Sequence, residues 1–393
     1  MYDNNFTLLG CESMDHKKRA ALLTTASFKA VSLLSLSVLS GISAPAMAKN
    51  ILDKLTVAEG FNVTLFADDV ENAREIAVSD KGIVYAGSMK AGNVYALIDR
   101  NQDGVADEKI LVASGLKLPS GVVIKDGDLY VSEVERIIRF KDIDNNLNSP
   151  KFEVVFDGFP SETHHGWKVL GVSPTGELII PVGVPCNVCA ENERYGRIFS
   201  LNLETKKLTT IAQGVRNSVG FDFQPGTQTL WFSDNGRDMM GDDIPPCEIN
   251  KVSYLGEHFG FPYVHAGTIL DPEFGQGKDP AKYTAPALSL GAHVAPLGIH
   301  FYLGKQFPSD YQQQLFVAEH GSWNRTKKAG YKVAVATIEQ GKVVKYTPFL
   351  TGFMQDEQTF GRPVAFAELA DGSLLVSDDY AGAIYRVTYP QTK

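Results

Sequence analysis

Extended apolar runs joined by tight turns recur along this chain. In each copy an extended segment leads into a turn containing Asp, Gly or Pro, and then into a strand of the Leu-Tyr-Val-Ser kind. A Gly in such a turn supplies the positive φ that a tight hairpin needs. Six copies occur, at Ala77–Gly87, Val123–Glu133, Gly171–Gly183, Asp222–Asp234, Phe301–Glu319 and Ala367–Asp379. A third predicted strand follows each, at Asn93–Ile98, Arg136–Phe140, Arg197–Leu201, Glu248–Val252, Tyr331–Ala336 and Ala383–Val387.

The spacing of these copies predicts the fold. Most second strands begin about 45 to 60 residues after the previous one, which is typical of four-stranded propeller blades. The longer gap, from Leu230 to Leu315, contains an insertion at Gly256–Leu290 that is rich in Gly, Pro and aromatic residues. We therefore expect an all-β fold, a six-bladed β-propeller, and an open sandwich is the weaker alternative.

The N-terminal segment has the features of an export signal. His16–Arg19 is basic, Phe28–Ile42 is apolar but too short for a membrane span, and Ala46–Ala48 forms an A-x-A cleavage site. We predict that residues 1–48 are removed, that residues 49–393 form one propeller domain, and that no membrane span is left. In a Gram-negative bacterium this places the protein in the periplasm; the alternative is an uncleaved anchor.

The net charge limits the classes of partner that are expected, and the cysteines bear on covalent and metal sites. The 393 residues carry a formal net charge of −9 without a basic patch, which argues against nucleic-acid binding and favours small-molecule partners. Cys186 and Cys189 lack the following His of a haem attachment site, and no second pair completes a zinc site. In an oxidising compartment we expect a local disulfide between them, with Cys247 left free.

One loop resembles a calcium-binding loop. Oxygen-bearing side chains alternate around a glycine there, at Asp99, Asn101, Asp103 and Asp107. Position 12 is Ile110 instead of Glu, and a degraded copy at Asp142–Asn146 lacks the glycine. Two interpretations stay open at this point: a structural calcium site, or a polar turn that holds no ion.

The segment that enters each innermost strand of a propeller faces the central axis. Its six copies are Asn72 with Arg74, Pro119–Gly121, His164 with His165, Arg216 with Asn217, His293–Pro296, and Gly361–Pro363. A single His or Arg is usually structural, but five of the six copies supply ionisable groups at one register. Because small apolar residues would suffice for stability, this set predicts a polar, partly cationic pocket.

Several segments resemble a known enzyme family. They are Gly214–Pro246, Gly256–His265, Gly291–Tyr302, Leu315–Arg325 and Gly361–Val387. They resemble the sorbosone and pyranose dehydrogenases that use pyrroloquinoline quinone (PQQ), relatives of soluble quinoprotein glucose dehydrogenase and of soluble aldose sugar dehydrogenases. The resemblance covers nearly all of residues 50–390, and its most specific parts are the HGSWNR and DNGRD segments.

The resemblance implies a six-bladed propeller with the quinone over the axis and a Ca²⁺ ion bound to it. It implies that His164, matched by its spacing to Lys168, is the catalytic base, with His165 as the rival. Arg216 would be the cation at the quinone oxygen. These residue types suit hydride transfer, because a base must take the hydroxyl proton and a cation must stabilise the charge gained by the acceptor.

The resemblance also implies a cofactor site. Its predicted side chains are those of Asn217, His293, Arg325 and Arg362, and the backbone carbonyls of Gly236 and Arg237 would hold the calcium ion. There are departures from the family pattern. Phe360 stands where glucose dehydrogenase has a second arginine, the family's cofactor lysine has no clear counterpart, and Cys247 stands where an acid is more usual.

The function expected from these features is periplasmic oxidation of a sugar or sugar-derived hydroxy-aldehyde by hydride transfer to PQQ. Electrons would then pass to a periplasmic acceptor that the sequence does not name. One alternative is a calcium-dependent, lactonase-like hydrolase, which needs acidic side chains at the axis. The other is a non-catalytic binding propeller, which would not require His164 and Arg216 at one register.

Overall fold

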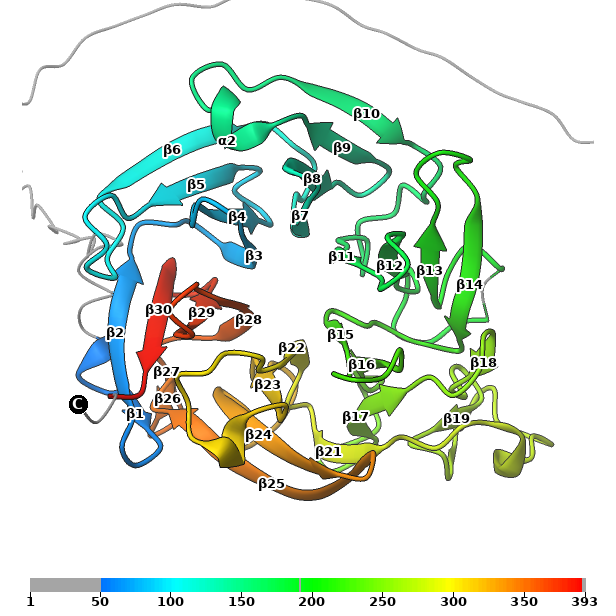
Figure 1. The fold of residues 1–393 in the computed structure, drawn as a ribbon. Coiled ribbons are helices and arrows are strands. Elements are labelled where there is room, and N and C mark those ends of the chain that lie inside the picture. Colours follow the sequence, from blue (N-terminus) through cyan, green and yellow to red (C-terminus); the bar gives the residue numbers. More distant parts are fainter. Residues whose placement is uncertain (1–50, 191, 391–393) are drawn as a thin grey trace, which may run out of the picture. The chain divides into compact units, whose positions relative to one another are not determined.

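The computed structural model describes residues 51–190 and 192–390 (Figure 1). The chain divides into two units, residues 1–41 and 42–393, and all described residues belong to the second. The predicted signal peptide, residues 1–48, lies outside them. The described part of the chain has no helix that is long and apolar enough to cross a membrane.

Six antiparallel sheets follow one another around a central axis, which confirms the predicted propeller (Figure 1). Blade 1 contains β3 (Ala73–Val78), β4 (Val84–Ser88), β5 (Val94–Ile98) and β6 (Glu108–Ala113). Blade 2 contains β7 (Val122–Lys125), β8 (Asp128–Ser132), β9 (Ile137–Phe140) and β10 (Phe152–Phe156), with the short helix α2 (Ile143–Asn146) before β10. Blade 3 contains β11 (Gly171–Val172), β12 (Leu178–Val182), β13 (Arg197–Leu201) and β14 (Leu208–Gln213).

The other three blades follow the same order from the axis outward. Blade 4 contains β15 (Phe221–Phe223), β16 (Leu230–Asp234), β17 (Pro246–Lys251) and β21 (Leu288–Ala292). Blade 5 contains β22 (Pro296–Phe301), β23 (Leu315–Glu319), β24 (Lys332–Glu339) and β25 (Lys342–Thr351), with β1 (Thr56–Val57) added at its edge. Blade 6 contains β28 (Pro363–Glu368), β29 (Leu374–Asp378), β30 (Ala383–Thr388) and β2 (Asn62–Ala67). Each predicted hairpin and third strand thus overlaps the corresponding observed strands.

The predicted insertion adds short strands outside the blades. Within it, β18 (Glu257–His258) lies parallel to β14 of blade 3, and β19 (Val264–His265) pairs with β20 (Ile269–Leu270). A second small hairpin, β26 (Met354–Gln355) with β27 (Gln358–Thr359), precedes blade 6. These hairpins were not predicted, because two-residue strands leave no periodic pattern.

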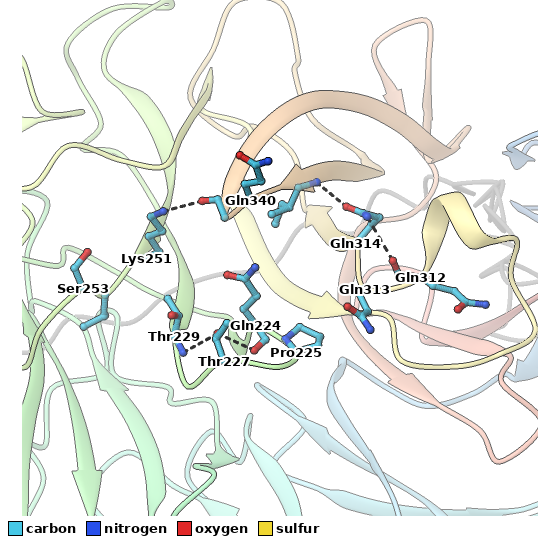
Figure 2. Close-up of a pocket in the computed structure, with 13 residues that line it drawn as sticks. Gln224, Pro225, Thr227, Thr229, Lys251, Ser253, Gln312, Gln313, Gln314 and Gln340 are labelled. Atoms are coloured by element: carbon cyan, nitrogen blue, oxygen red, sulfur yellow. Dashed lines mark hydrogen bonds between the residues drawn. The ribbon is translucent and has the colours of Figure 1, made fainter.

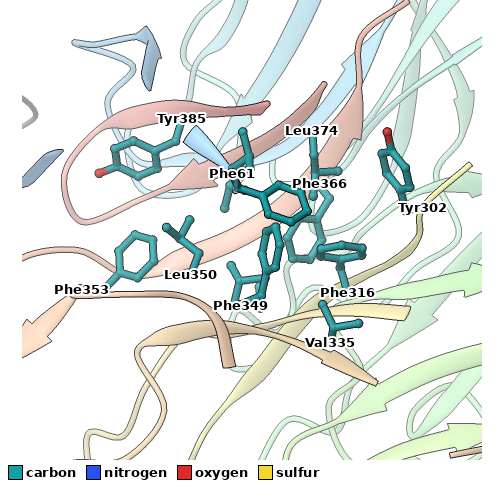
Figure 3. Close-up of a cluster of buried hydrophobic side chains, with 14 of the residues drawn as sticks. Phe61, Tyr302, Phe316, Val335, Phe349, Leu350, Phe353, Phe366, Leu374 and Tyr385 are labelled. Carbon is teal, nitrogen blue, oxygen red and sulfur yellow. The ribbon is translucent and has the colours of Figure 1, made fainter. Parts of the chain in front are cut away.

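The ring is closed by pairing the two ends of the described chain. β2 supplies the outer strand of blade 6 and runs antiparallel to β30, with Asn62 opposite Thr388. Phe61, just before β2, is 7% exposed and packs edge-on against the rings of Phe307 and Phe349, with centroids 4.8 and 4.9 Å apart (Figure 3). Apolar burial therefore reinforces the closing hydrogen bonds.

A charged bridge joins three innermost strands. His300 on β22 lies with Nδ1 3.0 Å from Asp222 Oδ2 on β15 and Nε2 2.8 Å from Glu368 Oε1 on β28. Burial alone would lower the pKa of His300, but the two carboxylates raise it to about 9. At neutral pH an imidazolium therefore links blades 4, 5 and 6.

This bridge predicts a pH dependence of stability. The folded-state pKa of His300 lies above the value of about 6.5 for an unfolded chain. Protonation therefore stabilises the fold fully below pH 6.5, and this stabilisation is lost as the pH rises through about 9. The difference between the folded and unfolded pKa values of His300 corresponds to roughly 3 kcal/mol of stabilisation. In urea unfolding, the free energy of unfolding of wild type should exceed that of His300→Gln by more at pH 6 than at pH 10. An equal difference in free energy at both pH values would contradict the bridge.

Candidate active site at the propeller axis

Side chains from five blades surround a cavity of about 300 Å³ at the axis. The predicted residues in its lining are Arg74, His165, Arg216, Asn217, Gly236, His293 and Arg362. The structure thus brings together the segments that enter the innermost strands. His320 and Trp323, from the segment that resembles the enzyme family, line it as well, and Trp167, Asp238 and Asp379 are among the lining residues that were not predicted.

A larger hollow of about 650 Å³ lies elsewhere, between turns of blades 4 and 5 (Figure 2). Five glutamines line it, at positions 224, 312, 313, 314 and 340. Its charged residue, Lys251, donates from Nζ to the Gly341 carbonyl at 2.7 Å. Because this hollow offers neutral amides and hydroxyls, the acid–base chemistry must be sought at the axis.

The two adjacent histidines have different surroundings. His164 is exposed and does not line the cavity, whereas His165 is 8% exposed and does. His165 donates from Nδ1 to the Val184 carbonyl at 2.8 Å, which leaves Nε2 as the acceptor nitrogen. Burial, with the charge of Arg216, lowers the pKa of His165 to about 3 and also lowers that of His164. Of the two histidines, the structure therefore brings His165 into the cavity and leaves His164 outside its lining.

Arg216 is buried and held on several sides. Its Nε and Nη2 donate to Asn187 O and Oδ1 at 2.9 and 3.0 Å, and Nη1 donates to the Asn235 carbonyl at 3.2 Å. Nη2 also lies 3.3 Å from Asp238 Oδ2. Burial lowers the pKa of Arg216, but a guanidinium with these partners stays charged. The cavity wall thus carries a fixed positive charge.

The backbone of this pair is anchored by the last residue of β16. Asp234 accepts hydrogen bonds from the backbone N–H groups of Arg216 and Asn217, at 2.8 and 2.7 Å. Blade 6 has an equivalent hydrogen bond: Asp378 at the end of β29 accepts from the backbone N–H of Arg362 at 2.9 Å. A buried carboxylate therefore fixes each of these two entry segments.

The opposite wall contains a second polar cluster. Asp379 accepts from His320 Nε2 and Arg74 Nη1, both at 2.8 Å. Burial alone would raise the pKa of Asp379, but His320 and Arg74 lower it, so the carboxylate is ionised. The neighbouring Arg362 donates to the carbonyls of His320 and Gly321 and has no carboxylate partner among the described residues. The sequence contained features that could have indicated this cluster, because Asp379 ends the sixth hairpin copy and His320 is the first residue of the HGSWNR segment.

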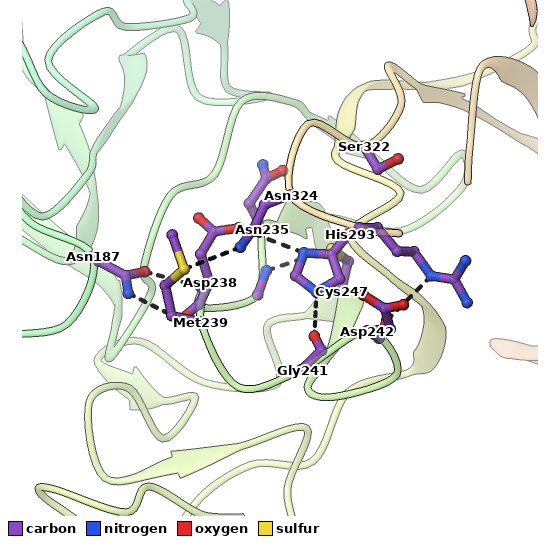
Figure 4. A network of polar contacts seen from close by, with 12 residues as sticks. Asn187, Asn235, Asp238, Met239, Gly241, Asp242, Cys247, His293, Ser322 and Asn324 are labelled. Carbon is purple, nitrogen blue, oxygen red and sulfur yellow. Dashed lines mark hydrogen bonds and ion pairs between the residues drawn. The ribbon is translucent and has the colours of Figure 1, made fainter. Parts of the chain in front are cut away.

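His293 joins the cavity to the loop after β16. It donates from Nε2 to the Gly241 carbonyl at 2.8 Å, and its Nδ1 lies 3.5 Å from Asp238 Oδ1 (Figure 4). Cys247 also lines the cavity as a buried free thiol, and burial raises its pKa to about 11. The prediction of a Cys186–Cys189 disulfide with Cys247 free is confirmed.

Two predicted arginine side chains are directed elsewhere. Arg325 is absent from the cavity lining and binds the Asp242 carbonyl and the Asp243 carboxylate, at 3.1 and 3.0 Å. The side chain of Arg237 forms ion pairs with Asp271 and Glu273 of the insertion. Within the described residues the carbonyls of Gly236 and Arg237 accept no hydrogen bond. Gly236 lines the cavity, whereas Arg237 does not.

The loop of Asp99 is organised by its own hydrogen bonds. Asn101 Nδ2 donates to Asp103 Oδ2 and Asp107 Oδ1, at 3.1 and 3.3 Å. Asp99 Oδ2 accepts from Gly104 N at 2.8 Å, while Oδ1 is buried without a partner. No group of three or more His, Cys, Asp or Glu residues in residues 51–190 and 192–390 is placed to hold a metal ion. A calcium site in this loop thus stays one of two interpretations, beside a polar turn without an ion.

The fold and cavity define a class: a six-bladed propeller with histidines and arginines gathered around an axial pocket. The chain belongs to the family described as a domain of unknown function, DUF7133, which it matches over residues 47–391. It is 38% identical over 361 residues to an uncharacterized protein of Borreliella burgdorferi, covering 87% of this chain and 93% of that one.

Other comparisons concern quinone-dependent enzymes. Over 125 residues the chain is 33% identical to a pyrroloquinoline quinone-dependent pyranose dehydrogenase of Coprinopsis cinerea, covering 27% of this chain and 16% of that one. The holo form of the PQQ domain of pyranose dehydrogenase from that fungus matches with a TM-score of 0.71 and 17% identity, covering 85% and 97%. A calcium structure of a Trichoderma reesei protein of carbohydrate-active enzyme family AA12 matches with a TM-score of 0.74 and 19% identity, covering 86% and 97%. The chain therefore shares the fold of PQQ-type sugar dehydrogenases.

The Asp234 anchor can be tested by removing its charge. Asp234→Asn should lower the free energy of unfolding by about 1–3 kcal/mol, because an amide cannot accept from both N–H groups as well as a carboxylate can. Asp157→Asn, at an exposed position, is the matched control. Urea unfolding at pH 7 compares them, and equal stability of the two variants would show that Asp234 is not an anchor.

Proposed function

We propose that this protein is a periplasmic, PQQ-dependent dehydrogenase that oxidises a sugar or a sugar-derived hydroxy-aldehyde. The observation that carries the proposal is the meeting of His165 and Arg216 in one axial cavity. The identity to the Coprinopsis enzyme supports it. Electrons would leave through a periplasmic acceptor.

The cavity suits this cofactor by its chemistry. PQQ is a planar quinone with three carboxylates, and Arg362 is a cation without a carboxylate partner among the described residues. Asn217, which follows Arg216 in the chain, also lines the cavity. The carbonyl of Gly236, which lines the cavity, is a hard oxygen ligand of the kind that Ca²⁺ prefers, and the carbonyl of Arg237 follows it in the chain.

When bound, the quinone supplies a hydride acceptor and Ca²⁺ polarises it as a Lewis acid. The chain's own part is proton handling and charge. His165 is kept neutral by its surroundings and oriented by Val184, so Nε2 can take the proton of a substrate hydroxyl. Arg216 has one Nη1 hydrogen that its described partners do not use, and its fixed charge stabilises negative charge developing in the cavity.

The hydrolase alternative is weaker. It needs free carboxylates at the axis, whereas each acid in the cavity lining faces a cation. Asp379 is paired with Arg74 and His320, and Asp238 lies beside Arg216 and His293.

The assignment of the base predicts unequal losses at neighbouring positions. Protein reconstituted with PQQ and Ca²⁺ is screened with aldoses and sorbosone in a dye-linked assay. On the best substrate, His165→Ala should lower kcat by roughly 10²- to 10⁴-fold. His164→Ala should stay within a few fold, because that ring is exposed.

The reverse ranking would return the role of base to His164, as the family spacing suggested. Two variants with wild-type turnover would contradict acid–base catalysis by either histidine. Quinone binding by both variants is measured in parallel, so that a loss of cofactor is not mistaken for a loss of the base.

The cofactor site predicts a different pair of outcomes. Arg362→Met should weaken binding of PQQ about tenfold or more, because it removes the unpaired cation. Arg325→Met is the matched control and should bind PQQ as wild type does, since Arg325 faces Asp242 and Asp243. Equilibrium quenching of tryptophan fluorescence measures both, and a loss confined to Arg325→Met would restore the family-based assignment.

A further inference from the structure

We propose that the Cys186–Cys189 disulfide loop positions Arg216, with Asn187 as the positioning residue, so that the oxidised disulfide is needed for full turnover. The part of this proposal that concerns turnover rests on the function proposed above. The part that concerns the position of Arg216 rests on contacts alone.

Asn187 provides two acceptors for one buried guanidinium. Its backbone carbonyl accepts from Arg216 Nε at 2.9 Å, and its side-chain Oδ1 accepts from Nη2 at 3.0 Å. The side chain of Arg216 is 5% exposed, so water cannot easily replace these partners. The direction of the guanidinium therefore depends on where Asn187 is held.

The amide of Asn187 is itself fixed by the loop after β16. Its Oδ1 accepts from Asp238 N and its Nδ2 donates to Asp238 O, both at 2.9 Å (Figure 4). These two bonds use both ends of the amide and exclude its flipped orientation. Asn187, Asp238 and Arg216 thus form one network across blades 3 and 4.

The same segment also holds the candidate base. Val184 donates from its backbone N to the Arg216 carbonyl at 3.0 Å and accepts from His165 Nδ1 at 2.8 Å. Residues 184–189 therefore contact both proposed catalytic side chains. No strand pairing is found in this segment, so these hydrogen bonds and the disulfide hold its backbone.

The disulfide closes a loop of only four residues, with Asn187 inside it. So short a loop constrains the unfolded chain little, so that its effect on global stability is small. Its local effect is larger, because it restricts the backbone that carries the Asn187 carbonyl. Both cysteines are partly exposed.

The first experiment tests how firmly Arg216 is held, and it uses the protein without quinone or sugar. Hydrogen exchange of the Arg216 Nε–H is followed by ¹⁵N NMR and assigned with Arg216→Lys. Exchange should be at least tenfold faster in Cys186→Ser/Cys189→Ser and in Asn187→Ala than in wild type. Asn62→Ala, at an exposed position on β2, is the control and should match wild type. Unchanged exchange in the double serine variant would overturn the proposal.

The second arm reads turnover of the quinone-loaded protein. Both variants should lose roughly 10- to 100-fold in kcat, the cost of misplacing a catalytic group by about 1 Å, while thermal unfolding stays near that of wild type. Asn187→Asp keeps the acceptor for Nη2 and should recover part of the loss. Full kcat in the double serine variant would contradict a role in turnover. If wild type oxidises no sugar, the proposed function fails, and the exchange arm still decides whether the loop holds Arg216.

Discussion

The antiparallel pairing of β2 with β30 is the constraint on which the axial cavity depends. It joins the first long strand of the described chain to the last and so closes six blades into a ring. Closure brings the six entry segments to one axis, where Arg74 on blade 1 meets Asp379 on blade 6 across 305 positions of sequence. The aromatic cluster around Phe61 excludes water beside this pairing.

Each acid in the cavity lining is paired with a basic side chain, and one basic side chain has no carboxylate partner among the described residues. Asp238 faces Arg216 and His293, and Asp379 faces Arg74 and His320. A buried charge without such partners would be costly. Arg362 instead rests on two backbone carbonyls, which orient the guanidinium without neutralising it. The cavity is therefore suited to an anionic ligand, although the protein as a whole carries a net charge of −9.

Much of the fold could be predicted because the strands of a blade are close in sequence: each hairpin lies in one continuous segment with its own turn. β2 could not be found in this way, since its partner lies at the other end of the chain. In the site, Arg216, Asn217 and Arg362 followed from blade register. The choice between His164 and His165 did not, because His165 has a φ of 50°, a left-handed conformation that neither strand periodicity nor the spacing to Lys168 predicts. The direction of the Arg325 side chain could not be predicted either, because its partners, the Asp242 carbonyl and the Asp243 carboxylate, lie 83 and 82 positions away in the sequence.

The central claim is that a sugar hydroxyl loses its proton to this cavity while its hydride leaves for a bound quinone. Anaerobic mixing of the PQQ- and Ca²⁺-loaded protein with excess aldose tests it most directly. The account predicts loss of the oxidised-quinone absorbance, with one equivalent of oxidised sugar formed for each quinone bound. Stable absorbance with every aldose and with sorbosone, while binding of the quinone is verified, would contradict it.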